Sequence, residues 1–510
     1  MSESNEPPVS IMDGVERLSP TGISIIIAGG GVGGLMTALE AWRQGHDVQV
    51  FEKNQGLDTI GDTFGILPPA WVTLRFFPAM KEQFERDTYD AEFSLWHYKG
   101  HKVVHLGEAD WNYPGAVHPA KDIRVPWIYH RPKIASMLTT QCERLGIPIE
   151  YGSTVVAYGE NSQRAFITIQ RAEDETTVKA DIVVAADGVG TKSHGHITGH
   201  QVRAESSGYA NYRGCIPTEI LKSQLCPQAF QKFFSCPRPE FRIYMTPSDG
   251  HGNIVLTKDF FCYALTYKEN DRKTKESWSA SVSAGTIVDT FSDWDPDMLE
   301  ILRLVPPNSA VDWTLRWRDP QPEWASRGGR VIQLGDSAHS FLPTSGNGAT
   351  QACEDALSLA TCLRIAGKGR EHVATKVHAK LRFERVSTIQ KFGFTTRQAL
   401  HNVDLEFAQD HPDVIGRAMH MPEWIWGHDP VKYAEENYGR AERHVLGGAP
   451  FQNSNVPPGY VYEPWTMEGE KEKEKLAKES STFPVGYGVK QEWHLSDLLS
   501  APETPGSSAG

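Results

Sequence analysis

Three glycines near the start of the chain have the spacing of a loop that holds a dinucleotide. Gly29, Gly31 and Gly34 match the pattern G-x-G-x-x-G. Residues 24–28 are apolar and mostly β-branched, which predicts a buried parallel strand, and residues 35–44 have helical periodicity. In such a turn the first glycine permits the tight bend, the second lets a pyrophosphate approach the backbone, and the third lets helix and strand pack closely.

An acidic residue follows at the distance where the ribose of a dinucleotide would lie. Residues 47–51 predict a second strand, and Glu52 comes directly after it. A carboxylate there can accept hydrogen bonds from ribose hydroxyls, and the helix N-terminus would face the phosphates. The glycine pattern alone is a weak signal, but strand, helix and acid together favour a nucleotide site.

Two later stretches also place an acid at the end of an apolar strand. One ends in Asp187-Gly188, and the strand over residues 330–334 is followed by Gly335-Asp336. Ligands bind outside the carboxyl ends of parallel strands, so we expect both acids near the glycine loop. His339 follows and suggests a base, but we favour a histidine that orients this loop.

The composition excludes several kinds of partner. The chain has 510 residues and a net charge of −13 without a basic stripe, so nucleic acid and anionic membranes are poor candidates. We find no secretory signal and no apolar run long enough to span a membrane, and we expect a cytoplasmic protein. The sequence leaves the oligomeric state open.

Neither the cysteines nor the histidines form a recognisable metal motif. Seven cysteines, none in a C-x-x-C pair, predict reduced thiols without a zinc site or a disulfide framework. The histidines at 97, 101, 105 and 118 are scattered and do not form H-E-x-x-H. We therefore predict no metal site.

The residue pattern divides the chain into several parts. Residues 201–324 contain short alternating segments that predict an antiparallel sheet, and they interrupt a nucleotide-binding domain formed by residues 21–200 and 325–410. Such an insertion places a cleft between the two domains, where we expect the substrate. The other parts are a disordered arm (1–20), a helical extension (411–445) and a partly ordered tail (446–510).

In this order along the chain, the motifs resemble the class A flavoprotein monooxygenases, the para-hydroxybenzoate and salicylate hydroxylase-like family. The resemblance covers residues 22–440, and the segment 422–429 (PEWIWGHD) is most similar to fungal members that tailor secondary metabolites. It implies an α/β fold with a Rossmann-like FAD-binding domain, an inserted, mainly antiparallel β-sheet substrate domain and a helical C-terminal extension.

The resemblance also implies that FAD is the bound cofactor and indicates its contacts. Glu52 would hold the adenosine ribose, and Asp336 would hold the ribityl hydroxyls. Gly348 and Ala349 would direct helix amides at the pyrimidine edge of the flavin, and Pro343 would lie beside its ring.

Two further positions match residues that lie near FAD in this family. Arg131, at the start of a predicted helix, matches an arginine that contacts FAD in relatives. Gly65 matches a glycine of the loop beside the flavin, although Thr63 and Phe64 replace the small residues of that loop.

Asp187 and Gly188 resemble a motif that in this family serves both FAD and the transient reductant, NADPH or NADH. In the family a serine and an arginine follow it. In this chain Thr191 can replace the serine hydroxyl, and Lys192 or His194 could partly replace the arginine charge. The choice between NADH and NADPH is therefore left open.

Two residues of the inserted domain resemble substrate contacts. Arg213 lies in Tyr212-Arg213-Gly214, and in fungal phenol hydroxylases the arginine of this strand can anchor a phenolate. Tyr244 lies about where a partner tyrosine occurs. The alternatives are a structural ion pair for Arg213 and a packed strand aromatic for Tyr244.

The resemblance implies an NAD(P)H:O2 monooxygenase reaction. NAD(P)H would reduce FAD, the reduced flavin would capture O2 as a C4a-hydroperoxide, and one oxygen would pass to an electron-rich aromatic molecule, in fungal secondary metabolism. Three alternatives remain: epoxidation of an alkene or indole, a non-catalytic flavin-binding protein, and a halogenase. The W-x-W-x-I-P signature of the halogenases is absent.

Overall fold

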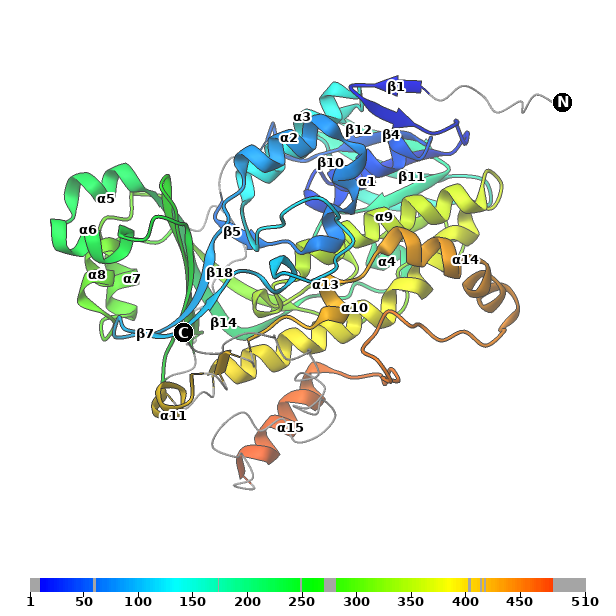
Figure 1. Ribbon diagram of the computed structural model, residues 1–510. Coiled ribbons are helices and arrows are strands. Elements are labelled where there is room, and N and C mark those ends of the chain that lie inside the picture. The colour runs from blue at the N-terminus through cyan, green and yellow to red at the C-terminus, as the bar shows by residue number, and fades with distance from the viewer. Residues whose placement is uncertain are drawn as a thin grey trace.

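The computed structural model describes residues 10–479, except 58–60, 173, 248–249, 270–280, 402–404, 413–414 and 417–418. Two large sheets organise the described chain, and a group of C-terminal helices packs against one side (Figure 1). None of the helices in the described part combines the length and apolar character needed to cross a bilayer.

A five-stranded parallel sheet forms the centre of the predicted nucleotide-binding domain. Its strand order is β19 (Val331–Gln333), β13 (Ile182–Ala185), β3 (Ser24–Ala28), β4 (Asp47–Phe51) and β9 (Ile149–Glu150). The chain runs from β3 to β4 on one side and later returns on the other side to β13, so β3 is the switch point of the sheet. Ligands of open parallel sheets bind at the carboxyl end of such a strand.

Both faces of this sheet are covered, which explains its nearly continuous apolar strands. The helices α1 (Val32–Arg43), α3 (Arg131–Arg144) and α9 (Gly348–Ala366) share its largest apolar core. The opposite face packs against an antiparallel sheet of three strands: β10 (Thr154–Glu160), β11 (Ala165–Arg171) and β12 (Asp174–Ala180).

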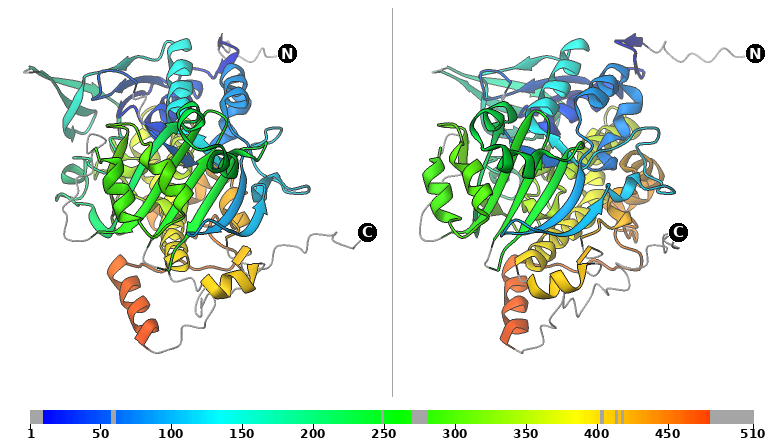
Figure 2. Two further views of the ribbon diagram at one scale, coloured as in Figure 1. Left: turned by 90° about the vertical axis from the view of Figure 1, so that its left-hand side faces the viewer. Right: turned by 60° about the vertical axis from the view of Figure 1, so that its left-hand side comes forward.

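The inserted domain is built on a seven-stranded sheet. Its order is β18 (Ala310–Trp317), β14 (Glu205–Pro217), β17 (Phe260–Lys268), β16 (His251–Leu256), β15 (Glu240–Met245), β6 (Glu92–His97) and β7 (Lys102–Gly107). All neighbouring pairs are antiparallel except β15 and β6. Figure 2 shows the helices that cover its outer face: α5 (Thr218–Gln224), α6 (Pro227–Phe234), α7 (Ala284–Thr290) and α8 (Pro296–Arg303).

The hairpin of β6 and β7 corrects the predicted domain division. Its residues precede 200 and were expected in the nucleotide-binding domain, but β6 pairs with β15 of the inserted domain. The sequence alternates between apolar and polar residues on both sides of Lys99 and Gly100, as expected for two strands joined by a turn. Alternation predicts a strand but does not indicate which sheet the strand joins.

The predicted disordered arm is also partly wrong. β1 (Ser10–Met12) and β2 (Val15–Arg17) form a hairpin, and residues 1–9 lie outside the described residues. Asp13 and Gly14 connect the strands with φ of +50° and +73°. Asp-Gly is the dipeptide that favours a tight turn with positive φ at both positions.

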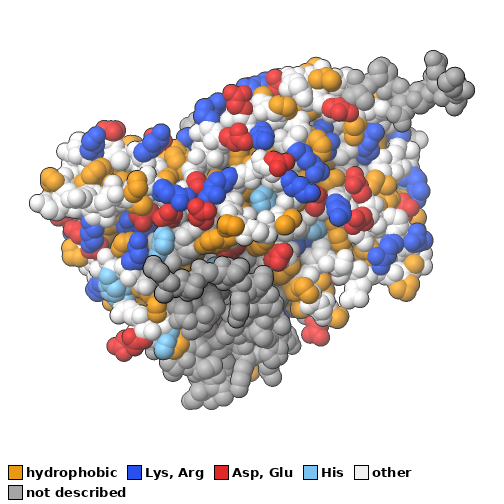
Figure 3. Space-filling model, viewed as in Figure 1, with side chains coloured by type: hydrophobic (Ala, Val, Ile, Leu, Met, Phe, Trp, Pro, Cys, Tyr) orange, Lys and Arg blue, Asp and Glu red, His pale blue; other side chains and the backbone are white. Residues whose placement is uncertain are grey.

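The C-terminal part is helical, as predicted. It contains α10 (Glu371–His401), α11 (Leu405–Asp410), α13 (Glu423–Trp426), α14 (Pro430–Gly447) and α15 (Met467–Glu479). Part of the predicted tail, residues 480–510, lies outside the described residues. On the face shown in Figure 3, acidic and basic side chains are interspersed over the described residues.

Short elements complete the described chain. They are β5 (Thr63–Gly65), β8 (Ile128–His130), the helices α2 (Pro78–Asp87) and α4 (His194–Ile197), and the 3₁₀ turns η1 (Pro68–Phe76), η2 (Asp110–Asn112), η3 (Gly335–Ser337) and η4 (Pro343–Ser345).

Candidate FAD and substrate site

The glycine loop has the geometry that each predicted role requires. Gly29 has a φ of +110°, and a Cβ there would lie 2.3 Å from the carbonyl oxygen of Ala186. A Cβ on Gly34 would lie 2.0 Å from the carbonyl oxygen of Gly29. At Gly31, by contrast, no described atom lies within 4 Å of an added Cβ. The fold therefore requires the outer two glycines, and the middle one leaves open the position where a pyrophosphate would approach.

This difference gives a test that separates cofactor binding from folding. We expect Gly31→Ala to fold normally and to bind FAD about 10-fold or more weakly, because the new methyl group would crowd the pyrophosphate. The measurement is a flavin titration together with a thermal unfolding curve. Gly56→Ala, which also adds a methyl group into open space, is the matched control. Wild-type flavin affinity in Gly31→Ala would show that no phosphate passes this residue.

The Glu52 carboxylate is fixed at the edge of the glycine loop. Its Oε2 accepts a hydrogen bond from the backbone amide of Gly30 at 2.7 Å, and its Oε1 accepts one from that of Asn54 at 2.8 Å. These two bonds orient the carboxylate, whose remaining lone pairs can accept from ribose hydroxyls.

The two strand-end acids lie in loops that follow neighbouring strands of the parallel sheet. Asp187 follows β13, accepts a hydrogen bond from the Tyr158 hydroxyl at 2.6 Å, and has a pKa raised by burial. Asp336 lies in η3, directly after β19, which pairs with β13. Arg318 ties the loops together by donating to the carbonyl oxygens of Asp336 and Val189. Arg318 could not be recognised from the sequence, since a single arginine after a strand is common.

The Asp336 carboxylate is open to solvent and yet surrounded by enough protein to raise its pKa. His339, Arg131 and Arg318 lie close enough to oppose this effect of burial. A partly desolvated carboxylate near two arginines can form strong hydrogen bonds to hydroxyl groups. This environment fits the predicted contact with the ribityl chain of FAD.

His339 holds the Asp336 loop in place. One of its ring nitrogens, Nε2, lies 2.6 Å from Asp355 of α9, and the same carboxylate oxygen accepts a hydrogen bond from the Gly335 amide at 3.1 Å. Arg382 of α10 binds the other oxygen of Asp355 at 2.8 Å. These contacts agree with the predicted orienting role of His339.

The charges around Glu354 and Asp355 predict how the folding stability of the protein depends on pH in the acidic range. Burial alone would raise the pKa of Glu354 and Asp355. Arg385 and Arg382 nevertheless lower that of Glu354 to about 2, and His339 and Arg382 hold that of Asp355 well below its usual range. In the unfolded chain these carboxyls take up protons near pH 4. The stabilisation is therefore present above that pH and is lost as the pH falls toward 2.

We expect the unfolding temperature of the FAD-loaded protein to fall steeply between pH 4 and pH 2, measured by calorimetry. Asp355→Asn should be less stable at pH 7 and should show a shallower fall in that interval. Asp289→Asn, an exposed acid of α7, serves as control. An equal pH dependence in wild type and Asp355→Asn would contradict this account.

The predicted contacts with the flavin ring lie together at the start of α9. An added Cβ on Gly65 would lie 3.0 Å from the carbonyl oxygen of Gly346, which has a φ of +60°. Gly348 and Ala349 form the first turn of α9, and η4, which begins with Pro343, precedes it. The side chain of Asn347, at the N-cap position, does not cap α9, which leaves amides of its first turn available to an anionic ring edge.

The carboxylate of Asp62 links a predicted FAD contact, Arg131, to Arg213 of the inserted domain. Asp62, only 2% exposed, binds the guanidinium of Arg213 through Nε at 2.7 Å and Nη2 at 2.6 Å. Its other neighbour is Arg131, whose Nε lies 3.6 Å away. Burial lowers the pKa of Arg131, and the charges that act on it are Asp62, Arg213 and Asp336. Asp62 directly precedes Thr63 in the sequence, which did not indicate a role for this acid.

Tyr244 does not lie with these residues. It is fully buried and stacks between Trp96 and Trp294, with ring centroids 5.8 Å away in each case. It shares an apolar cluster with Tyr212, so it faces α7 and α8, whereas Arg213 points to the opposite face of the sheet. Burial raises the pKa of Tyr244 to about 12. This environment agrees with the alternative of a packed strand aromatic.

The structure corrects the expectation for His194. Its side chain is buried, its Nδ1 accepts a hydrogen bond from Gln333 at 3.1 Å, and burial lowers its pKa to about 4. The ring is therefore neutral at pH 7 and cannot supply the positive charge of the arginine that the family carries. Lys192 is exposed and retains that possibility.

The expectation of seven reduced cysteines is also corrected. Cys215 and Cys262 form a disulfide, with their Cα atoms 4.1 Å apart. The cysteines are 47 residues apart in the chain, and the pairing of β14 with β17 places them opposite each other. A disulfide between two cysteines so far apart in the chain cannot be predicted from a local sequence motif.

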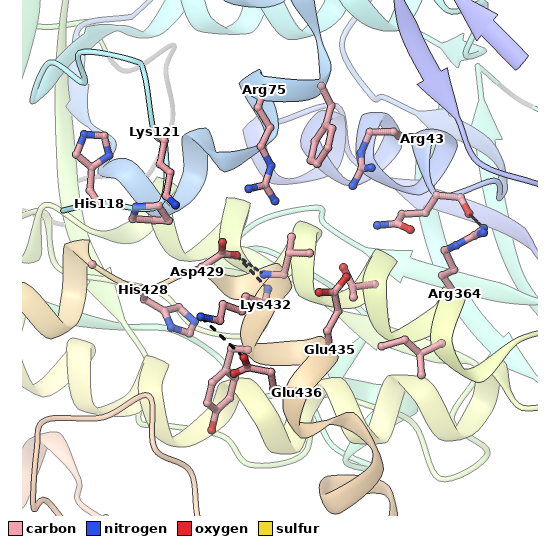
Figure 4. Close-up of a pocket in the computed structure, with 18 of the residues that line it drawn as sticks. Arg43, Arg75, His118, Lys121, Arg364, His428, Asp429, Lys432, Glu435 and Glu436 are labelled. Atoms are coloured by element: carbon pink, nitrogen blue, oxygen red, sulfur yellow. Dashed lines mark hydrogen bonds and ion pairs between the residues drawn. The ribbon is translucent and has the colours of Figure 1, made fainter. Parts of the chain in front are cut away.

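A cavity of about 1000 Å³ lies elsewhere in the molecule (Figure 4). Arg75 and Lys121 line one wall, and Glu435 and Glu436 of α14 lie opposite. Its lining residues Arg43 and Arg364 lie at the C-terminal ends of α1 and α9, whereas the predicted FAD contacts lie at the N-terminal ends of these helices. The cavity is therefore separate from the candidate FAD site.

The parallel sheet, the glycine loop and the strand-end acids define a flavoprotein of the Rossmann-like class. Residues 23–378 match the FAD binding domain family, and the chain belongs to this family. It is an FAD-dependent monooxygenase, as its similarity to curated relatives shows.

Two fungal relatives align over most of their length. The chain is 35% identical to the FAD-dependent monooxygenase fsr3 of Gibberella fujikuroi over 479 residues, which cover 92% of this chain and 90% of the relative. It is 36% identical to mdpD of Emericella nidulans over 462 residues, covering 89% and 88%.

Solved structures share the architecture. CtdE in complex with FAD and a substrate has a TM-score of 0.74 and 26% identity, and the match covers 83% of this chain and 99% of CtdE. A salicylate hydroxylase substrate complex has a TM-score of 0.61 at 20% identity, covering 82% and 98%, and it shows a common fold. The predicted fold class and FAD cofactor are thus confirmed.

Proposed function

We propose that this monooxygenase uses NADPH or NADH and O2 to hydroxylate an electron-rich, phenolic or other aromatic small molecule in fungal secondary metabolism. One observation carries the proposal. Arg131 is surrounded by Asp336, Asp62 and Arg213, so the predicted FAD contact and the predicted substrate contact belong to one cluster of charges. A substrate held at Arg213 would lie next to the flavin.

Arg213 is the residue of this chain that would act on the substrate. A phenol beside a guanidinium loses its proton more readily, and the phenolate carries more electron density on its ring. Asp62 fixes the guanidinium by a bidentate ion pair, which sets the direction in which Arg213 points. Orientation and lowered phenol pKa together prepare the ring carbon for attack.

FAD, once bound and reduced, supplies the activation of O2 and the transfer of one oxygen atom. The first turn of α9 and the loop that contains Gly65 would position the flavin ring. The side chains of Arg213 and Asp62 are only 11% and 3% exposed, and a site shielded from water protects a reactive cofactor from side reactions.

Epoxidation of an alkene or indole is the second candidate, and the Asp62 ion pair favours it. Since Asp62 balances the charge of Arg213, the site does not need an anionic substrate. A neutral indole could donate a hydrogen bond from its N–H, or stack near this pair, without becoming ionised.

The test is the rate of NADPH and NADH oxidation by the FAD-loaded protein in the presence of phenols and of indoles, with products identified by mass spectrometry. Stimulation by phenols, with one added oxygen in the product, supports the proposal. Stimulation confined to indoles or alkenes favours the epoxidase. Flavin reduction without stimulation by any compound of either class would contradict both.

A further inference from the structure

Two cysteines and a histidine meet on the sheet face that carries Arg213. Cys215 lies two residues beyond Arg213 on β14, hence on the same face, and is paired with Cys262 of β17. His130 ends β8 and completes the cluster. One ligand atom from each of the three residues lies within 4.8 Å of the other two.

The His130 ring packs against an aromatic neighbour, and one of its nitrogens lacks a hydrogen-bond partner among the described residues. It stacks on Phe260, with ring centroids 4.7 Å apart. Its Nδ1 is buried and makes no hydrogen bond to any described residue. A buried ring nitrogen without a partner is costly, and histidine nitrogens are common ligands of transition metals.

We propose that Cys215 and Cys262, when reduced, bind a thiophilic divalent cation such as Zn²⁺ together with His130. Tetrahedral zinc places its sulfur and nitrogen ligands about 3.5 to 3.8 Å apart. Atoms already within 4.8 Å reach this spacing by side-chain rotation once the disulfide is open. Three protein ligands leave the fourth position of the metal for water or for an atom of a small molecule.

The disulfide form of the same pair excludes the cation. A dithiol reductant breaks the S–S bond by passing two electrons and two protons to the cysteines, and the reductant becomes a disulfide. Binding of the cation then releases the two thiol protons, because thiolates are the ligands. The site is therefore available only under reducing conditions.

A cation at this site would stand next to the proposed substrate position. Arg213 and Cys215 are neighbours on one face of β14, so an ion held by Cys215 occupies space beside the guanidinium. We expect Zn²⁺ to inhibit the reduced enzyme and to leave the oxidised enzyme unaffected. This inhibition rests on the proposed function, whereas uptake of the metal does not.

The test is the zinc content of the FAD-loaded protein after reduction with a phosphine, incubation with Zn²⁺ and desalting. We expect one zinc per chain in reduced wild type and none in oxidised wild type. Reduced Cys215→Ser and Cys262→Ser should lose the zinc. Cys226→Ser should retain it, because that thiol is exposed and lies outside the cluster. His130→Phe preserves an aromatic ring without a nitrogen and should also lose tight binding.

Flavin absorbance and thermal unfolding verify that each variant is folded. Reduced wild type with seven titratable thiols and no more zinc than Cys215→Ser would overturn the proposal, as would full zinc content in His130→Phe. If zinc binds as expected but does not inhibit substrate-stimulated oxidation, the metal site stands and the proposed position of the substrate beside Arg213 fails.

Discussion

Replacing Asp336 by alanine is expected to yield a folded protein that is purified with little or no flavin. In the proposed site this carboxylate holds the ribityl hydroxyls and balances Arg131 and Arg318. The loss of a charged hydrogen-bond partner costs about 1.5 to 3 kcal/mol, which weakens FAD binding roughly 10- to 150-fold. The measurement is the ratio of flavin to protein absorbance, followed by titration with added FAD.

Asp336→Asn is the informative partner variant, because its amide oxygen can still accept hydrogen bonds from hydroxyls. It should recover part of the affinity. Asp289→Ala removes an exposed acid of α7 and should contain wild-type amounts of flavin. Normal flavin content in Asp336→Ala would remove Asp336 from the cofactor site.

The second large effect is expected at Arg213. Arg213→Ala should retain FAD and lose most of the substrate-stimulated oxidation of NADPH, by roughly 10- to 150-fold if one charged hydrogen bond to substrate is lost. The single variant also leaves the carboxylate of Asp62 buried without its bidentate partner, at a cost of about 3 to 5 kcal/mol in stability. The assay is therefore combined with a thermal unfolding curve.

A double variant separates the two effects. Asp62→Asn/Arg213→Gln removes both charges, so it should be more stable than Arg213→Ala and equally poor in stimulated oxidation. If the double variant regains wild-type stimulation, Arg213 has only a structural role and the ion pair is its function.

Tyr244→Phe tests the other residue predicted on the substrate side. Because Tyr244 faces α7 and α8 rather than Arg213, removal of its hydroxyl should change stimulated oxidation less than about 2-fold, within the small range expected for a volume-conserving change. A loss of stimulated oxidation as large as that of Arg213→Ala would show that Tyr244 does contact the substrate.

The sequence predicted those parts of the site that are encoded locally. Gly29, Gly31 and Gly34 lie in one turn, and their steric roles follow from their spacing. Asp336 could be placed because the carboxyl ends of parallel strands meet at one edge of a sheet. In these cases a short motif and one rule of topology were sufficient.

The parts that were missed depend on distant strands. Asp62 and Arg213 are 151 residues apart, and only the folded chain brings them together. The sequence could not show that Arg213 and Tyr244 lie on opposite faces of the sheet. Alternation within one strand does not indicate which of its residues share a face with residues of another strand. The disulfide between Cys215 and Cys262 was missed for the same reason, since it depends on the register of β14 against β17.

The most direct test of the central claim is the visible absorption spectrum of the purified protein, recorded before and after anaerobic addition of NADPH. A monooxygenase that holds FAD should show a flavin band near ~450 nm, and this band should bleach on reduction. A colourless protein that does not take up added FAD would contradict the account, and so would a flavin band that neither NADPH nor NADH bleaches, even in the presence of phenols or indoles.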